Sequence, residues 1–272
     1  MIDLHCHILP GLDDGPAVLA ESLHMAETAV AGGIRAIVAT PHADTGVYSF
    51  TPEDVAERVA LFNADLAAAS IPLQVYPGAE VQLSPGLAER VQQGKVATLN
   101  HSRYLLLELP PTLLPDSCKN EMFNLLSHGF IPIIGHPERH AFLQKNPAYL
   151  ADLVQMGVLC QLTAQSLLGA FGRKIKGAAE QMLHNRLAHI IASDAHGTQG
   201  RVAALDGAVS AAAGLLHSRN KALQMVTGVP AAIINDSDVS VEPPDMASGD
   251  RKKIPWHNSA GSFFSSISGW WS

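Results

Sequence analysis

Residues 1–16 read MIDLHCHILPGLDDGP, a stretch that combines a short apolar run, two histidines and a tight acidic turn. His5 and His7 are two positions apart, so on an extended strand both side chains project from the same face. Two histidines at this spacing are suited to joint coordination of one metal ion. The stretch therefore predicts a strand that ends in a metal site, whereas a lone histidine there would more often be a core or solvated residue.

Similar apolar runs recur along the chain and alternate with segments of helical period, as parallel strands joined by crossover helices do. Seven strands are predicted, over residues 1–5, 35–40, 73–80, 104–109, 131–136, 158–163 and 189–194. Helices are predicted over residues 17–31, 52–69, 116–128, 147–155, 174–185 and 201–216, with a shorter one after Pro85. Seven such units favour an α/β fold of the distorted, TIM-like (β/α)7-barrel type, although an open doubly wound sheet obeys the same local rules.

The length and composition favour one main domain. A chain of 272 residues with 47% hydrophobic and 16% charged residues can bury a single large core. We predict a barrel domain over residues 1–236 and a C-terminal tail over 237–272, where the composition changes to Ser, Pro, Gly and charge and ends in GSFFSSISGWWS. The tail is interpreted as a flexible extension rather than a docking or membrane-touching segment, because it is short and lacks a basic face.

Charge and cysteine content exclude several classes of protein. A formal charge of -7 provides no broad basic field for a nucleic-acid partner. Three scattered cysteines form no disulfide framework, which favours a reducing compartment. The N-terminus lacks the pattern of a signal peptide, and no run approaches about 18 uninterrupted apolar residues. We expect a cytoplasmic protein without a transmembrane segment.

Further potential metal ligands occur near the carboxyl ends of the predicted strands. These ends converge on one mouth in barrels and in open parallel sheets alike, so ligands scattered in sequence can meet there. Glu80 and Glu108 each lie in an apolar run, where a metal would offset the cost of burying an unpaired charge. The candidates are His5, His7, His42, Glu80, Glu108, His136, Asp194 and His196. Histidine and carboxylate ligands without cysteine suit Zn, Mn or Fe better than a thiolate-rich structural zinc site.

Two other histidines have less specific interpretations. His140 follows His136 by four residues and is taken as an exposed loop residue rather than part of the mouth. His189 begins a predicted strand, at the end away from the proposed site.

Six ordered segments resemble the PHP family (polymerase and histidinol phosphatase), in particular its bacterial protein-tyrosine phosphatases of capsule and exopolysaccharide synthesis. They are MIDLHCHILPGLDDGP, TPH at 40–42, GAE at 78–80, LLLELP at 105–110, GHPER at 135–139 and SDAHG at 193–197, and the match runs from residue 1 to about 235. The resemblance implies three divalent metal ions, with Mn expected and Fe or Zn as alternatives. It implies His5, His7, Glu80 and Asp194 around one ion, Glu80, Glu108 and His136 around a second, and Asp14, His42 and His196 around the third.

The same resemblance implies that Arg139 and Arg201 face the substrate phosphate. Taken singly, Arg139 could instead cap a helix and Arg201 could lie on a solvated helix face. The implied activity is that of a hydrolase, a metal-dependent protein-tyrosine phosphatase. Its implied substrate is a phosphotyrosine protein, the tyrosine-rich tail of a bacterial tyrosine kinase that regulates exopolysaccharide.

The chemistry is consistent with this implication. Clustered cations offset the repulsion between a phosphomonoester dianion and a hydroxide nucleophile, and they lower the pKa of the water that they hold. A cysteine-based phosphatase needs an arginine six residues after its cysteine, but those positions hold other residues after all three cysteines. Alternatives are a PHP phosphatase for a small molecule such as histidinol phosphate, a non-catalytic metal-stabilised scaffold, and a metal-dependent amidohydrolase, which shares the H-x-H opening and the barrel.

Overall fold

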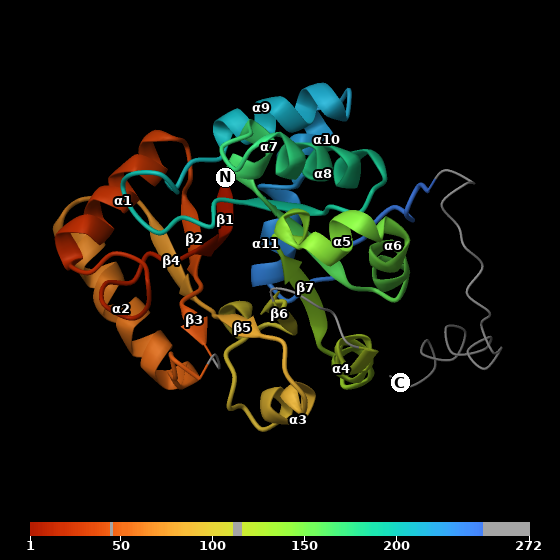
Figure 1. Cartoon of the computed structure of the whole chain (residues 1–272). Coiled ribbons are helices and arrows are strands. Elements are labelled where there is room, and N and C mark those ends of the chain that lie inside the picture. The colour runs from red at the N-terminus through yellow and green to blue at the C-terminus, as the bar shows by residue number, and fades with distance from the viewer. Residues whose placement is uncertain (44–45, 111–115, 247–272) are drawn as a thin grey trace, which may run out of the picture.

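The computed structural model describes residues 1–43, 46–110 and 116–246, and it places parallel strands at the centre with helices around them (Figure 1). A three-stranded sheet has the order β1-β2-β4, and a six-stranded sheet has the order β3-β5-β6-β7-β8-β9. The strands are β1 (Ile2–Cys6), β2 (Ala36–Ala39), β3 (His42–Ala43), β4 (Gln74–Pro77), β5 (Glu80–Gln82), β6 (Tyr104–Glu108), β7 (Ile131–Gly135), β8 (Leu159–Thr163) and β9 (Ile190–Ala192).

Two of the predicted strands are followed closely by a further short strand. The run predicted over 35–40 appears as β2, and β3 follows after Pro41; the run predicted over 73–80 appears as β4, and β5 begins at Glu80, beyond Gly78. Proline lacks the N–H that a continuous ladder needs. At Gly78 a Cβ atom would lie 2.7 Å from Cγ1 of Val38, so the close approach requires glycine. β2 pairs with β4, and farther along the same two chain segments β3 pairs with β5. The three-stranded sheet is therefore followed along these segments by the six-stranded sheet.

The first and last strands are joined by backbone hydrogen bonds. The N–H of Asp194 donates to the carbonyl oxygen of His5 at 2.8 Å, and the N–H of His7 donates to that of Ala195 at 2.9 Å. Cys6 and Ala195 form an isolated parallel bridge at the same place. The end of the last strand thus lies beside the first strand, and the predicted α/β fold with parallel strands is confirmed.

The helices are α1 (Leu19–Ala31), α2 (Pro52–Ala68), α3 (Leu87–Gln92), α4 (Asp116–Ser127), α5 (Ala141–Lys145), α6 (Pro147–Gln155), α7 (Ala164–Leu168), α8 (Arg173–His184), α9 (Asp206–Leu215), α10 (Arg219–Gln224) and α11 (Gly228–Ile234). Two short 3₁₀ turns are η1 (Leu99–His101) and η2 (Pro137–Arg139). At the start of α2, Thr51 and Asp54 form a capping box in front of Pro52, which explains its sharp beginning. The helix predicted over 201–216 begins only at Asp206.

The apolar residues of the strands form two layers. Alternate strand residues pack outward against the helices, while an inner cluster includes Leu4, Val38, Leu106, Ile133, Leu159 and Ile190. Ile233 and Ile234 of α11 belong to this inner cluster. Several strands contribute an apolar residue to it before they reach a polar one, as Leu106 precedes Glu108. The polar side chains therefore collect at the carboxyl ends of the strands.

Part of the predicted tail lies against the barrel. The hydroxyl of Tyr104 donates to the carbonyl oxygen of Ser237 at 2.7 Å, and the Arg186 guanidinium lies 3.2 Å from a Glu242 carboxylate oxygen. The N–H of Asp245 donates to the carbonyl of Asn185 at 2.9 Å. The rest of the predicted tail, residues 247–272, lies outside the described residues.

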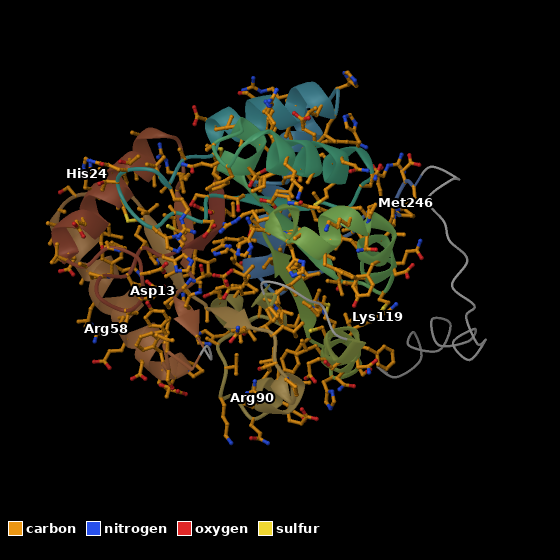
Figure 2. All side chains as sticks on the ribbon, viewed as in Figure 1. Asp13, His24, Arg58, Arg90, Lys119 and Met246 are labelled. Atoms are coloured by element: carbon orange, nitrogen blue, oxygen red, sulfur yellow. The ribbon has the colours of Figure 1, made fainter. Side chains whose placement is uncertain are left out.

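The outer helices carry exposed polar side chains. Figure 2 shows His24 and Arg58 at the periphery on α1 and α2. Of the helices in the described ranges, none is long and apolar enough to cross a membrane.

Candidate metal centre

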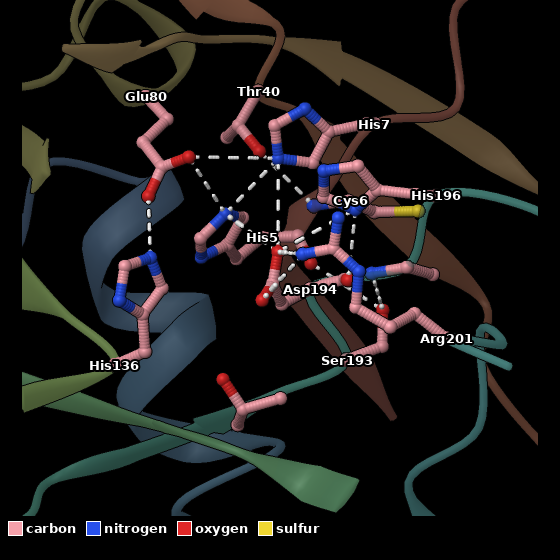
Figure 3. A network of polar contacts seen from close by, with 12 residues as sticks. His5, Cys6, His7, Thr40, Glu80, His136, Ser193, Asp194, His196 and Arg201 are labelled. Carbon is pink, nitrogen blue, oxygen red and sulfur yellow. Dashed lines mark hydrogen bonds and ion pairs between the residues drawn. The ribbon is translucent and has the colours of Figure 1, made fainter. Parts of the chain in front are cut away.

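Polar side chains from separate strand ends meet in one place, as Figure 3 shows. His5 and His7 come from the end of β1, Glu80 begins β5, and Asp194 follows β9. All four are at most 1% exposed. The predicted convergence of these residues is therefore present, and it is deeply buried.

The two histidines of the H-x-H pair face each other through their Nε2 atoms. The Nδ1–H of His5 donates to Oε1 of Gln161 at 2.9 Å, and the Nδ1–H of His7 donates to Oδ2 of Asp13 at 2.6 Å. In neutral rings with these tautomers both Nε2 atoms are unprotonated, and they lie 3.2 Å apart. Two lone pairs at this separation call for a positive charge between or beside them.

Glu80 and Asp194 bring carboxylate oxygens to the same pair of nitrogens. Oε2 of Glu80 lies 3.4 Å from Nε2 of His5 and 3.6 Å from Nε2 of His7. Oδ1 of Asp194 lies 3.4 Å and 3.8 Å from the same two atoms. His5, His7 and Glu80 form one group whose donor atoms all lie within 4.8 Å of one another.

A second such group lies nearer the surface and contains His7, Asp14, His42 and His196. Oδ1 of Asp14 lies 3.5 Å from Nε2 of His42 and 3.2 Å from Nε2 of His196. The Asp14 side chain is 50% exposed, so this group opens to solvent. The structure thus brings together the three residues that the resemblance assigns to one ion.

A third group contains His42, Glu80 and Glu108. Nδ1 of His42 lies 3.1 Å from Oε2 of Glu80 and 3.7 Å from Oε2 of Glu108. His136 lies outside all three groups, but its Nε2–H donates to Oε1 of Glu80 at 2.9 Å. Around Glu80 and Glu108 the geometry thus favours His42, where the resemblance implies His136.

The charges of the cluster are strongly coupled. Although burial opposes ionisation, His5 and His136 help to hold the pKa of Glu80 well below its ordinary value. Burial also disfavours protonated His7, yet hydrogen bonds to Asp13 and Glu80 raise its pKa to about 10. The same carboxylates that keep a proton on His7 would favour divalent cations in its place.

The pKa values of two outer members of the cluster, Glu108 and His196, are shifted in opposite directions. Burial and the charge of Glu80 raise the pKa of Glu108. Burial and the neighbouring His7 lower the pKa of His196 to about 4, so this ring is neutral and able to act as a ligand near pH 7.

Two histidine nitrogens of the cluster, Nδ1 of His42 and Nε2 of His196, are buried without a hydrogen-bond partner among the described residues. Carboxylate oxygens lie close to both, but not in hydrogen-bonding geometry. Nitrogen and carboxylate donors arranged in this way fit divalent metal ions such as Mn, Fe or Zn.

Two candidate ligands have strained backbones. His136 has φ of 36° and Asp194 has φ of 53°, both in the left-handed region. Such a conformation costs about 1–3 kcal/mol for a residue other than glycine and is retained where surrounding structure fixes it. Behind His136, the buried carboxylate of Glu138 accepts hydrogen bonds from the Thr163 N–H at 3.1 Å and the Ser166 hydroxyl at 2.6 Å. These bonds anchor η2, the turn that follows His136.

The two candidate phosphate-binding arginines reach the same carboxylate from different loops. The guanidinium group of Arg139 forms a hydrogen-bonded ion pair with Asp194, and Nη1 of Arg201 lies 3.2 Å from Oδ2 of Asp194. Arg139 also stacks over the ring of Phe171 at 5.2 Å. Neither arginine has the role considered for it in isolation, a helix cap or a solvated helix face, because both point into the mouth.

Beside this mouth lies a pocket of about 200 Å³. It is lined by Glu108, Leu109, Gly135, His136, Arg139 and His140. His140 is 8% exposed and its Nε2–H donates to the carbonyl of Pro110 at 2.7 Å. The interpretation of His140 as an exposed loop residue is therefore wrong, because this bond holds the ring in the pocket wall.

Three residues that position the cluster were missed from the sequence. Asp13 accepts hydrogen bonds from His7 and, at 3.0 Å, from the His42 N–H. In the sequence it lies in the acidic turn, where nothing distinguishes it from Asp14. Gln161 is a polar residue between the apolar residues Cys160 and Leu162 of a buried strand, which was a usable signal. Glu138, within GHPER, had no sequence feature that distinguished it from a surface carboxylate.

The cysteines are not placed for nucleophilic catalysis. Cys6, Cys118 and Cys160 are all free and buried. Burial raises the pKa of each thiol, and Cys6 packs in the outer apolar layer. A thiolate is the reactive form of cysteine, so these positions favour packing roles.

The chain is similar to known proteins over most of its length. The chain is 39% identical over 201 residues to the tyrosine-protein phosphatase YwqE of Bacillus subtilis, which covers 74% of this chain and 79% of that protein. It is 29% identical over 241 residues to the tyrosine-protein phosphatase CpsB of Streptococcus pneumoniae, covering 87% and 99% of the two chains. A crystal structure from a study of YwqE and CpsB, described as unique metal-dependent tyrosine phosphatases, superimposes with a TM-score of 0.87 at 34% identity, covering 91% of this chain and 99% of that one. The family model for capsular polysaccharide synthesis, CpsB/CapC, matches residues 1–234, and the chain belongs to this family.

Proposed function

We propose that this protein is a metal-dependent phosphatase that removes phosphate from phosphotyrosine on proteins. The observation that carries the proposal is the pair of Nε2 atoms of His5 and His7, facing each other 3.2 Å apart beside buried carboxylates. Similarity to YwqE and CpsB, named as tyrosine phosphatases and as metal-dependent, supports the same activity.

The proposed centre holds three divalent ions, with Mn expected and Fe or Zn as alternatives. His5, His7, Glu80 and Asp194 would hold the most buried ion, and Asp14, His42 and His196 the most exposed. Glu80 and Glu108 would hold the remaining ion, with His136 or His42 completing its ligands. Bound cations would supply an activated water nucleophile and neutralise the charge of the phosphate.

The protein's own groups would bind and orient the substrate. Arg139 and Arg201 present guanidinium groups at the edge of the cluster, and this planar fork suits the oxygens of a phosphate. Charge that develops on those oxygens during transfer would be stabilised by the same groups. Asp194 links both arginines to the ligand set, so phosphate binding and metal binding would share one residue.

The proposed physiological substrate is the tyrosine-rich tail of a bacterial tyrosine kinase that regulates exopolysaccharide. Membership of a capsular polysaccharide synthesis family supports this setting. The cytoplasmic location expected from the sequence belongs to the same proposal.

Comparison of two substrates tests the assignment against its nearest rival. The purified protein, loaded with Mn²⁺, would be assayed for phosphate release from a phosphotyrosine peptide and from histidinol phosphate. We expect a higher kcat/KM with the peptide. A strong preference for histidinol phosphate would assign the protein to small-molecule metabolism instead, and absence of turnover with both in a metal-loaded protein would favour a scaffold.

A further inference from the structure

Gln161 is a buried polar residue between Cys160 and Leu162 on strand β8. It lies in β8, in register with Gly135 of β7 and Ile190 of β9, and is 1% exposed. Its Oε1 accepts a hydrogen bond from Nδ1 of His5 at 2.9 Å, while its Nε2 has no partner within the described ranges. A buried amide with one half unpaired is destabilising, so stability alone does not account for it.

We propose that Gln161 is a positioning residue that fixes the ring of His5 with the Nε2 lone pair toward the metal ions, an inference that rests on the metal site proposed above. With the proton on Nδ1 donated to Gln161, the neutral ring leaves Nε2 free to coordinate. That atom lies 3.4 Å from both Oε2 of Glu80 and Oδ1 of Asp194.

The opposite orientation of the amide would disable His5 as a ligand. The NH₂ group of Gln161 would then donate to Nδ1, and the ring proton would move to Nε2, inside the cluster. An Nε2 that carries a proton has no lone pair for a metal. Coordination by His5 therefore depends on the Gln161 oxygen as the acceptor of the hydrogen bond from Nδ1.

A neutral amide suits this position better than a carboxylate does. Asp13 serves His7 in the same way, but its carboxylate also accepts hydrogen bonds from the N–H groups of Gly15 and His42, both at 3.0 Å. Glu80 and Asp194 already place two negative charges near His5. Gln161 orients the His5 ring without adding a third negative charge to the metal-free protein.

Two variants of the full chain separate the acceptor role from packing. Gln161→Met keeps the length of the side chain and removes the acceptor, whereas Gln161→Glu keeps an acceptor and removes the donor. Thr163→Val is the matched control, because Thr163 lies two residues along the same strand and its buried hydroxyl also lacks a partner among the described residues. Each protein would be stripped with a chelator and titrated with Mn²⁺, and thermal unfolding of the stripped form would be recorded.

We expect Gln161→Met to weaken binding of the tightest Mn²⁺ by about 10–100-fold, the usual effect of losing an outer partner of a histidine ligand. Its stripped form should unfold at about the wild-type temperature. Gln161→Glu should bind at least as tightly as the wild type, and Thr163→Val should match the wild type.

Wild-type affinity in Gln161→Met would overturn the proposal, and so would a Gln161→Glu variant that binds as weakly as Gln161→Met. If the Met variant does not fold, Gln161→Asn, which withdraws the acceptor by one methylene, takes its place with the same expectation. Both negative results leave Mn²⁺ binding by the wild type intact. A wild type that binds no Mn²⁺ would instead overturn the metal site itself.

Discussion

Arg139 and Arg201 both point at Asp194, so removal of one arginine should affect phosphate more than metal. Asp194 keeps its second guanidinium partner in either single variant. The carboxylate also keeps its place beside His5, 3.4 Å from Nε2. Phosphate binding and metal binding are therefore separable by experiment at this carboxylate.

For Arg139→Ala we predict a fall in kcat/KM for a phosphotyrosine peptide of about 100-fold, because one positioned donor to the transferring phosphate is lost. Bound metal should stay at the wild-type level when measured by elemental analysis. Arg173→Ala, an exposed position on α8, serves as the control and should show wild-type kinetics. Unchanged kinetics in Arg139→Ala, or loss of metal, would remove Arg139 from its proposed role.

His189 gives the fold a dependence on pH that is separate from the metal site. Burial lowers the pKa of His189 to about 4, and its Nδ1 accepts a hydrogen bond from the Cys160 N–H at 3.0 Å. The unfolded chain takes up a proton on this ring near pH 6.5, whereas the folded chain does so only near pH 4. The folded state is therefore destabilised as the pH falls from about 6.5 to about 4, by about 3 kcal/mol over the full range.

In His189→Asn the amide oxygen can accept the same bond without titrating. We predict that its free energy of unfolding, measured by urea denaturation between pH 7 and pH 4.5, falls less steeply than that of the wild type. Parallel curves for the two proteins would show that His189 protonates normally in the folded state.

At the level of elements, the turn after β1 is the part of the site that depends most on glycine. Gly15 packs against His7, and its N–H donates to Oδ1 of Asp13 at 3.0 Å. A Cβ atom at Gly15 would collide with the carbonyl oxygen of His7 and lie 3.1 Å from its Cβ. The turn can hold Asp13 behind the His7 ring only with glycine at this position.

Gly15→Ala should therefore destabilise the protein by about 1–3 kcal/mol and weaken its binding of Mn²⁺. Gly197→Ala is the control, because a Cβ atom there meets nothing within 4 Å in the described structure. Thermal unfolding and Mn²⁺ titration of both variants would check this. Two variants with the same stability and affinity would show that the turn adapts.

The elements differ in how far the sequence could predict them. Strands with a continuous apolar run, such as 104–109, appear within a residue or two of their predicted bounds. The break at Gly78 between β4 and β5 was not predicted, because it results from close contact with Val38 on another strand. The short helices α5 and α7 were also missed, since each has only five residues and a weak periodic signal.

At the scale of the whole molecule, convergence of the candidate ligands could be predicted because parallel strands bring their carboxyl ends to one mouth. Which ligands share one metal ion could not be predicted, since this depends on side-chain directions that are fixed by packing. His136 shows this: it follows β7 as expected, but its left-handed backbone turns the ring toward Glu80 and outside the three donor groups. Gln161 acts through a contact with His5, 156 positions away in sequence, which local patterns do not reveal.

The central claim is that a divalent metal cluster at this mouth hydrolyses phosphotyrosine. The most direct measurement follows phosphate release from a phosphotyrosine peptide while Mn²⁺ is titrated into chelator-stripped protein, with bound metal counted at each step. We predict negligible turnover in the stripped protein and full recovery only after more than one ion has bound per chain. Turnover that persists undiminished in protein shown to be free of metal would contradict the account.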